Sequence, residues 1–274
     1  AQDWLANAPI EVGEWPDSVE ARDVAPEFLE QDGAFLYRTA HFEFHSPNKL
    51  SISVVREFAR LFEATYEGVK ALPVGFNPIP PKNGYFKTKL YNSMQSYMAD
   101  GGMPGSGGQF SWRSRGREFV SGQIQVPLTS LGVKRVGERY ILEHKDDSGT
   151  LIHEITHQVA VMWGIKGAPI WFSEGLAEYI QSARYNKGVM RFGNMPKRVE
   201  EMVMRRGGNQ FNMLELSQLM TISRQQWAAD LGSGAAGRNY NSANALMTYF
   251  LHIDGEGNGA HMAAYLRELD KGTD

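Results

Sequence analysis

The chain has 274 residues, of which 42% are hydrophobic and 22% charged, the composition of an ordinary globular protein that can bury a substantial core. Its formal net charge of −3 offers no basic field for phosphate backbones, so we expect no nucleic-acid partner. The absence of cysteine excludes disulfides, thiolate metal ligands and a cysteine nucleophile, and no apolar run approaches the roughly 18–20 residues of a membrane span.

The first 35 residues are rich in Pro, Asp and Glu and predict an N-terminal arm that Trp4 and Trp15 anchor to the main body. The chain begins Ala-Gln-Asp, as the product of signal-peptide cleavage would, and we therefore expect a secreted or periplasmic protein. A chain trimmed at its start for another reason would begin in the same way.

Alternating and helical patterns follow up to residue 165. Residues 39–46 (TAHFEFHS) alternate with period two, which predicts a half-buried strand. Residues 51–72 carry apolar side chains at three- and four-residue spacing, which predicts a long amphipathic helix. The glycine-rich residues 101–108 predict a loop, either a plain connector or a mobile lid over a cleft. Further strands are predicted at residues 84–91, 109–113 and 119–127, the last two as a hairpin or paired strands.

After residue 165 the pattern is almost wholly helical. Strands that precede helices predict an α+β protein, with a sheet-plus-helix lobe over residues 36–165 and a helical lobe over residues 166–274. The helices of the second lobe are predicted at residues 171–185, 196–206, 214–231, 242–252 and 259–269.

The motif HEITH lies in a segment that capping residues and Gly164 mark as a helix over residues 150–163. At 3.6 residues per turn, His153 and His157 project from neighbouring turns of one helix face, within reach of one tetrahedral ion. The spacing therefore predicts a zinc centre, with buried structural histidines as the alternative.

Zinc that keeps one position open for water needs a third protein ligand. The next predicted helix, in the sequence WFSEGLAEY, carries Glu174 and Glu178 four residues apart, so both can face the first helix. Glu174 can bind the ion while Glu178 accepts the ring N–H of a ligand histidine and fixes its tautomer.

HEITH, separated by sixteen residues from the first glutamate of WFSEGLAEY, resembles the gluzincin metallopeptidases, the superfamily of thermolysin and the zinc aminopeptidases. It looks most like their bacterial, mostly uncharacterised peptidase-like members. The resemblance, strong over residues 148–180, implies a zincin-like fold and zinc-dependent hydrolysis of a peptide or protein substrate. The implied roles are zinc ligands at His153, His157 and Glu174, a general base at Glu154, a supporting carboxylate at Glu178, and an oxyanion-stabilising tyrosine at Tyr240, just before a helix, with Tyr249 as runner-up.

The sequence departs from two related groups of zinc peptidases, and these departures limit the kind of peptidase that we expect. The metzincins place a third histidine where this chain has Trp163. The zinc aminopeptidases carry a glutamate for the substrate amine in a region that here reads SGQIQVP, residues 121–127, without an acidic residue. We therefore expect an endopeptidase rather than an aminopeptidase, with an edge strand around residues 122–126 to pair with an extended substrate. The alternative is a non-catalytic zinc-containing protein that binds a peptide or glycan.

A second group of potential ligands lies in the strand predicted at residues 39–46. His41, Glu43 and His45 share one strand face and could hold another metal ion. The solvated face of an edge strand explains the same three residues, so zinc at the HEITH motif is the one cofactor that we predict.

Overall fold

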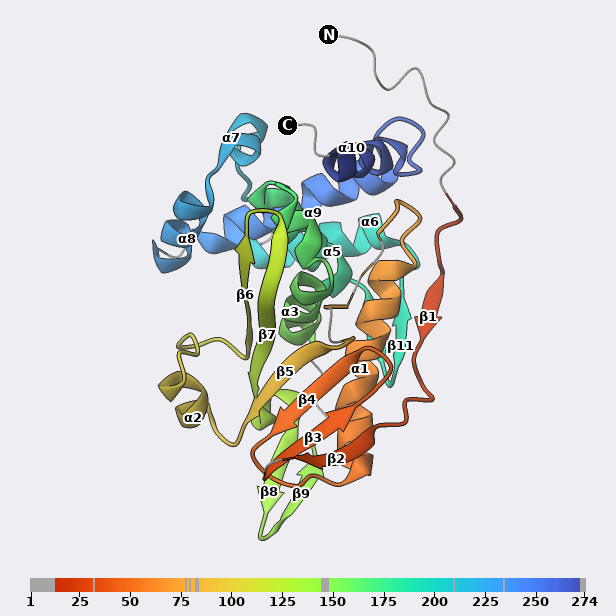
Figure 1. Cartoon of the computed structure of the whole chain (residues 1–274). Helices are drawn as coiled ribbons and strands as arrows, with labels where there is room; N and C mark the ends of the chain where they lie inside the picture. Colours follow the sequence, from red (N-terminus) through yellow and green to blue (C-terminus); the bar gives the residue numbers. More distant parts are fainter. Residues whose placement is uncertain are drawn as a thin grey trace.

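The computed structural model describes residues 13–271, except 32, 77, 79, 82–83, 144–147, 209 and 234. Over these residues the protein is an α+β structure with a mixed sheet at one end and a group of helices at the other (Figure 1), which confirms the predicted fold class at this level. Within the same residues, no helix is long and apolar enough to cross a membrane. Trp4 and its predicted anchoring role lie outside the described residues.

The main sheet has the strand order β2-β3-β4-β5-β7-β6. The pairs β4–β5 and β5–β7 are parallel and the other neighbours are antiparallel. Parallel neighbours need a crossover connection, which helix α1 (Ile52–Lys70) provides between β4 and β5. The strands are β2 (Glu27–Gln31), β3 (Ala34–Arg38), β4 (Phe42–Ser46), β5 (Phe86–Tyr91), β6 (Gln109–Arg115) and β7 (Glu118–Pro127).

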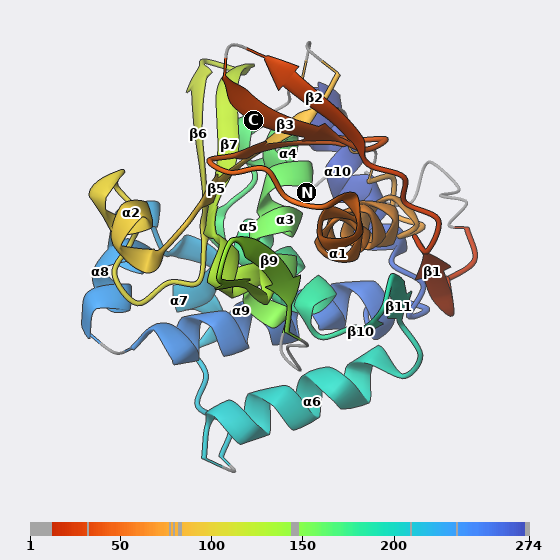
Figure 2. The same cartoon turned by 90° about the horizontal axis from the view of Figure 1, so that it is seen from below.

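Helices cover one face of the sheet and leave the other open. Helix α1 and helix α3 (Gly149–Val159) lie on the same side of the sheet when it is seen from below (Figure 2). Phe44 of β4 packs edge-on against Phe58 and Phe62 of α1, with ring centroids 5.1 and 5.0 Å apart. Because side chains alternate along a strand, Glu43 and His45 project from the open face. The predicted strand is thus confirmed over Phe42–Ser46, but His41 precedes it and stacks on Tyr66 of α1, with ring centroids 3.7 Å apart, instead of sharing the face of Glu43 and His45. Strand β4 lies between β3 and β5, so it is not the edge strand that we considered.

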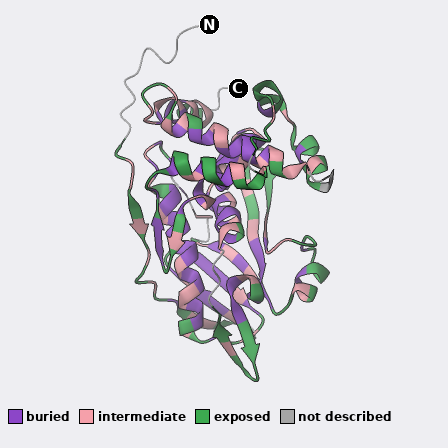
Figure 3. Ribbon diagram, turned by 180° about the vertical axis from the view of Figure 1, so that it is seen from behind, coloured by how far each residue is buried: buried purple, intermediate pink, exposed green. Residues whose placement is uncertain are grey.

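The two predicted lobes share one hydrophobic core. Buried side chains form a single cluster that runs from Tyr37 in the sheet to Leu266 near the end of the chain. Figure 3 shows the buried residues continuing from the sheet into the helical part. The boundary predicted near residue 165 therefore does not separate two cores. It separates strands from helices only in part, because two strands (Arg184–Asn186 and Val189–Arg191) follow it and helices α1 and α3 precede it.

The described part of the segment predicted as an N-terminal arm, residues 1–35, contributes strands to both larger sheets. Its strand β2 belongs to the main sheet, and its strand β1 pairs with residues near position 190. Trp15 does pack onto the body, with its ring centroid 4.5 Å from that of His252. The small sheet has the order β1-β11-β10 and consists of β1 (Ser18–Glu20), β11 (Val189–Arg191) and β10 (Arg184–Asn186).

The helix predicted over residues 150–163 is interrupted. Helix α3 ends at Val159, and a short helix α4 (Val161–Ile165) follows after Ala160. Ala160 has φ −98° and ψ 7°, the sparsely populated region next to the α-helix. The β-branched residues on both sides of it have low helix propensity, which favours a break at this point. The whole HEITH motif lies in α3.

Helix α9 begins earlier than predicted, at Ala236 rather than near residue 242, and the helix predicted over residues 214–231 is divided in two. Helices α5 and α9 approach closely at Gly175, where a Cβ atom would lie 2.5 Å from the carbonyl oxygen of Ala243. The helices after α4 are α5 (Ile170–Gln181), α6 (Met195–Arg206), α7 (Leu216–Thr221), α8 (Arg224–Ser233), α9 (Ala236–His252) and α10 (Ala260–Lys271). The pattern also failed to predict the strands β1, β2, β3, β10 and β11. Further elements that it did not predict are α2 (Met94–Ala99), the hairpin of β8 (Val133–Val136) and β9 (Arg139–Leu142), and a short 3-10 turn at Leu128–Leu131.

Candidate metal centre

Helices α3 and α5 bring three potential metal ligands together. His153 and His157 project from successive turns of α3, and their Nε2 atoms lie 3.0 Å apart. The Oε2 atom of Glu174 on α5 lies 3.2 Å from the Nε2 atom of each histidine. The three side chains are between 11 and 16% exposed, so the group is largely shielded from solvent.

The separations of these atoms fit a tetrahedral ion. Zinc bonds of about 2.0–2.1 Å place neighbouring tetrahedral ligand atoms roughly 3.3 Å apart. The three observed separations lie between 3.0 and 3.2 Å, close to one face of such a tetrahedron. Among the residues that the structure describes, this is the one group of three histidine or acidic side chains whose ligand atoms lie within 4.8 Å of one another.

The charges of the group call for a cation. Burial alone would lower the pKa of His153, but its hydrogen bonds to Glu174 and Glu178 outweigh burial and raise the pKa to about 10. Burial alone would raise the pKa of Glu174, but the neighbouring His157 and His153 hold it well below its ordinary value. Three converging electron-pair donors repel one another unless a positive charge lies among them. A proton or a metal ion can supply that charge.

Each histidine is oriented by a partner at its other ring nitrogen. The Nδ1 atom of His153 lies 3.3 Å from Oε1 of Glu178, and that of His157 lies 3.2 Å from Oγ of Ser173. The carboxylate of Glu178 is itself held by a guanidinium N–H of Arg206 on α6. An Nδ1–H donated to these oxygens leaves Nε2 unprotonated and directed at the shared centre. Glu178 thus lies where the sequence placed it, whereas Ser173 and Arg206 were not predicted.

Glu154 lies beside the terminal strand of the main sheet. Its Oε2 atom accepts a hydrogen bond of 2.7 Å from the backbone N–H of Phe110 in β6. The prediction of a free edge around residues 122–126 is wrong, because these residues belong to β7, which pairs with both β5 and β6. Strand β6 lies beside β7, antiparallel to it, and is the last strand on this side of the sheet. Glu154 therefore marks the free side of β6 near the ligand group.

Tyr240 faces the ligand group from α9. Its ring lies edge-on to the ring of His153, with centroids 5.8 Å apart, and edge-on to Trp227 of α8 at 5.5 Å. Burial raises the pKa of Tyr240 above its ordinary value, and the nearby carboxylates, Glu174 first among them, raise it further. The hydroxyl therefore stays protonated at neutral pH.

Two predictions about tyrosines need correction. Tyr240 lies in the second turn of α9 rather than before it, because the helix begins at Ala236. Tyr249, the runner-up for the oxyanion-stabilising role, is 42% exposed, and its hydroxyl donates to Asp254 at 3.2 Å. An exposed tyrosine engaged with its own helix end is no candidate for the site, so Tyr240 is the tyrosine that the fold brings near.

A small hollow of about 130 Å³ opens beside the ligand group. Arg224, at the start of α8, lines it together with His157, Glu174 and the β6 residues Phe110 and Trp112. The Nη2 atom of Arg224 lies 3.5 Å from the carbonyl oxygen of Ala168, and the structure gives its guanidinium no carboxylate partner among the described residues. Sequence reasoning missed Arg224 because 50 residues separate it from Glu174. The hollow thus contains a cationic side chain as well as the ligands.

The second group of histidines does not converge. His41 Nδ1 pairs with Glu63 at 2.6 Å, and His45 Nε2 pairs with Glu43 at 2.7 Å. Glu43 also accepts a hydrogen bond of 2.8 Å from Arg38. Each carboxylate in this region therefore has its own partner, and the second metal site is not formed by these described residues.

Comparison with known families gives a match over part of the chain. Residues 147–269 match a family described as "Protein of unknown function (DUF1570)". This stretch is less than half of the 274 residues, and it runs from just before α3 into α10. It contains the residues of the metal centre except those of β6, and none of the second group of histidines. No curated protein and no solved structure matches the chain.

Proposed function

We propose that this protein is a zinc-dependent peptidase of the gluzincin type, with a zincin-like arrangement of its sheet, α3 and α5. The observation that carries the proposal is the convergence of His153, His157 and Glu174 onto one point, with atom separations that suit a tetrahedral ion. The supporting hydrogen bonds at Nδ1 of both histidines are of the kind that orients zinc ligands. Three protein ligands leave a fourth position for water or substrate.

The free edge of β6 is a second observation in favour of a peptide substrate. Backbone groups on the free side of a terminal strand can pair with an extended chain. The backbone N–H of Phe110 points to that side, because it donates to Glu154. A peptide that lies along β6 would therefore pass Glu154 and the hollow lined by Trp112 and Arg224.

Glu154 and Tyr240 supply the proton chemistry in this proposal. Bound zinc would polarise the substrate carbonyl and lower the pKa of a water molecule. Glu154 takes a proton from the attacking water and passes it to the leaving amine nitrogen as the carbon–nitrogen bond breaks. Tyr240 donates its hydroxyl hydrogen to the carbonyl oxygen as negative charge develops there, which its raised pKa permits.

The closing test combines metal analysis with cleavage of a random peptide library. We expect one zinc ion per chain and internal cleavage of peptides. A chelator should stop the cleavage, and added zinc should restore it. Acetylation of the amino terminus of a good substrate should leave its rate nearly unchanged. Zinc at one per chain without cleavage of any peptide would instead favour a non-catalytic binding protein, and absence of zinc would contradict the proposal.

A further inference from the structure

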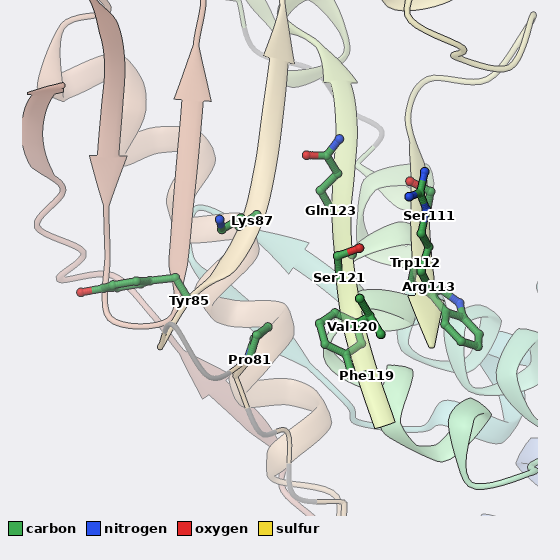
Figure 4. Close-up of a pocket in the computed structure, with 11 residues that line it drawn as sticks. Pro81, Tyr85, Lys87, Ser111, Trp112, Arg113, Phe119, Val120, Ser121 and Gln123 are labelled. Atoms are coloured by element: carbon green, nitrogen blue, oxygen red, sulfur yellow. The ribbon is translucent and has the colours of Figure 1, made fainter. Parts of the chain in front are cut away.

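A separate hollow of about 730 Å³ lies on the open face of the sheet, away from the helices (Figure 4). Figure 4 shows Lys87 on β5 and Gln123 on the neighbouring β7, with Trp112 and Arg113 across from them on β6. The register places Lys87 opposite Gln123 and Gln123 opposite Ser111. These three side chains therefore form one row across three strands and share one face.

The wall of the hollow carries positive charge and no negative charge of its own. Lys87 and Arg113 both line it, and none of the eleven described residues in its wall is acidic. Glu43, which lies opposite Lys87 on β4, already pairs with Arg38 and His45. Within the described part of the chain, neither Lys87 nor Arg113 pairs with a carboxylate. Lys89, two residues along β5, does pair with Asp100, at 2.8 Å. Because the protein as a whole carries a net charge of −3, this is a local departure from its charge balance. The lining thus favours an anionic ligand.

A ligand in the hollow can contact the side chains of the strands below it, but not unpaired backbone groups. Strand β5 pairs with β4 and β7, and β7 pairs with β5 and β6, so their ladder hydrogen bonds are already made. An extended peptide that binds a sheet by strand addition needs unpaired backbone groups, which the floor of this hollow lacks. A ligand here must be recognised by its own polar groups and by its shape.

The side chains in the wall match the groups of a sugar. The hydroxyls of Ser111 and Ser121 and the amide of Gln123 can both donate and accept hydrogen bonds, as sugar hydroxyls do. Tyr85 and Trp112 border the hollow on opposite sides (Figure 4). Arg38 lies over one face of the Tyr85 ring, and Trp112, which alternates with Ser111 and Arg113 along β6, also lines the hollow beside the metal centre, so both residues limit the hollow rather than form its floor. Two cations suit carboxylates but are too few to follow a nucleic-acid backbone.

We infer that this hollow, defined by Tyr85, Lys87, Ser111, Trp112, Arg113 and Gln123, binds an acidic saccharide whose carboxylates pair with Lys87 and Arg113. Its size lies within the range of about 300–1,000 Å³ found for small-ligand sites. The inference does not rest on the peptidase proposal, since the hollow contains none of the metal-centre residues. Trp112 lines both hollows, so a saccharide bound here would lie just across β6 from the ligand group.

Calorimetric titration of the full chain with trigalacturonate tests this inference. We expect saturable binding by the wild-type protein, and much weaker binding of the trimethyl ester, which has the same rings but no charge. The double variant Lys87→Gln, Arg113→Gln should bind trigalacturonate about 100-fold more weakly, because it loses two charge-assisted contacts. The matched control Lys197→Gln, Arg205→Gln removes two exposed cations of α6 and should bind as the wild type does.

Four outcomes would overturn the inference. They are no binding of trigalacturonate by the wild type, equal binding of the ester, equal weakening in the α6 control, and binding of an oligoglutamate peptide in place of the saccharide. The comparison of acid and ester uses the wild type alone, so it decides the question even if the double variant folds poorly. Zinc content measured on the same samples should be unchanged in both double variants.

Discussion

The chain has two groups of histidines and glutamates, one in the metal centre and one on strand β4 and beside it, and the contacts of their side chains differ. In the metal centre, the Nε2 atoms of His153 and His157 and a carboxylate oxygen of Glu174 point at one another. On the open face of the sheet, His45 and Glu43 pair with each other, and His41 turns away to Glu63. The first group needs an added cation, whereas each carboxylate near the second group already has its own partner.

The difference follows from the geometry of the elements that carry the residues. Neighbouring turns of one helix place side chains four residues apart on the same patch of surface. Alternate residues of one strand lie about 6.6 Å apart along the strand, which is too far for ligands of one ion unless the side chains bend together. Similar residue types at short spacing therefore predict a metal site on a helix much more strongly than on a strand.

Removal of Glu174 should give the largest effect. Glu174→Ala leaves two histidines to hold the ion, so we expect zinc content to fall close to zero and peptide cleavage to disappear with it. Metal analysis after dialysis and a cleavage assay measure both. Glu43→Ala, on the open sheet face, is the matched control and should keep its zinc. Equal loss of zinc in the two variants would remove the distinction between the two groups.

Glu154→Gln should abolish chemistry while it keeps the metal. The amide oxygen can still accept the hydrogen bond from Phe110, but an amide does not take a proton from water. We expect near-complete zinc content and a cleavage rate about 10²–10⁴-fold lower, the usual contribution of a general base. A variant that retains both zinc and rate would show that Glu154 has another role, such as fixing the edge of β6.

The local patterns predicted four strands of the main sheet and its crossover helix, but not β2 and β3. Alternation in residues 39–46 and residues 84–91, and helical spacing in residues 51–72, each found an element with ends within three residues of the observed ones. These segments bury one face in the core, so the hydrophobic period reports their structure directly. The spacing within HEITH and within WFSEGLAEY likewise predicted which side chains face each other across α3 and α5.

Tertiary contacts decided the parts that the sequence did not predict. The early start of α9 includes Asn239, a poor helix former, which is buried and donates to Asp230 at 2.8 Å. Strands β1 and β11 pair across about 170 residues of sequence, and nothing local signals this partner. Arg206 reaches Glu178 from another helix, so its role depends on how α6 packs. Such contacts exist only after the chain has folded.

Glu178→Gln should weaken the metal centre without removing a ligand. Glutamine keeps the shape but loses the negative charge that raises the basicity of His153 and that Arg206 now balances. We expect zinc affinity to fall about 10- to 100-fold, with activity partly restored by excess zinc. Ser173→Ala, which removes a neutral partner of His157, should have a smaller effect. A competitive zinc titration measures both affinities. A larger loss of zinc affinity in Ser173→Ala than in Glu178→Gln would contradict these roles of Ser173 and Glu178.

Glu43→Gln should give the smallest effect, a loss of folding stability at neutral pH that disappears in acid. Burial alone would raise the pKa of Glu43, but its hydrogen bonds with Arg38 and His45 outweigh burial and hold the pKa below its ordinary value of 4.5. A depressed carboxylate stabilises the folded state above pH 4.5, and this contribution is lost as pH falls through the folded-state pKa. We expect the variant to be roughly 1 kcal/mol less stable at pH 7 and equal to the wild type at the acid end of this window. Urea unfolding at both pH values measures this difference, and a zinc titration should show no change. A stability gap that widens on acidification, or a loss of zinc, would show that Glu43 is not simply a neutralised carboxylate on the sheet face.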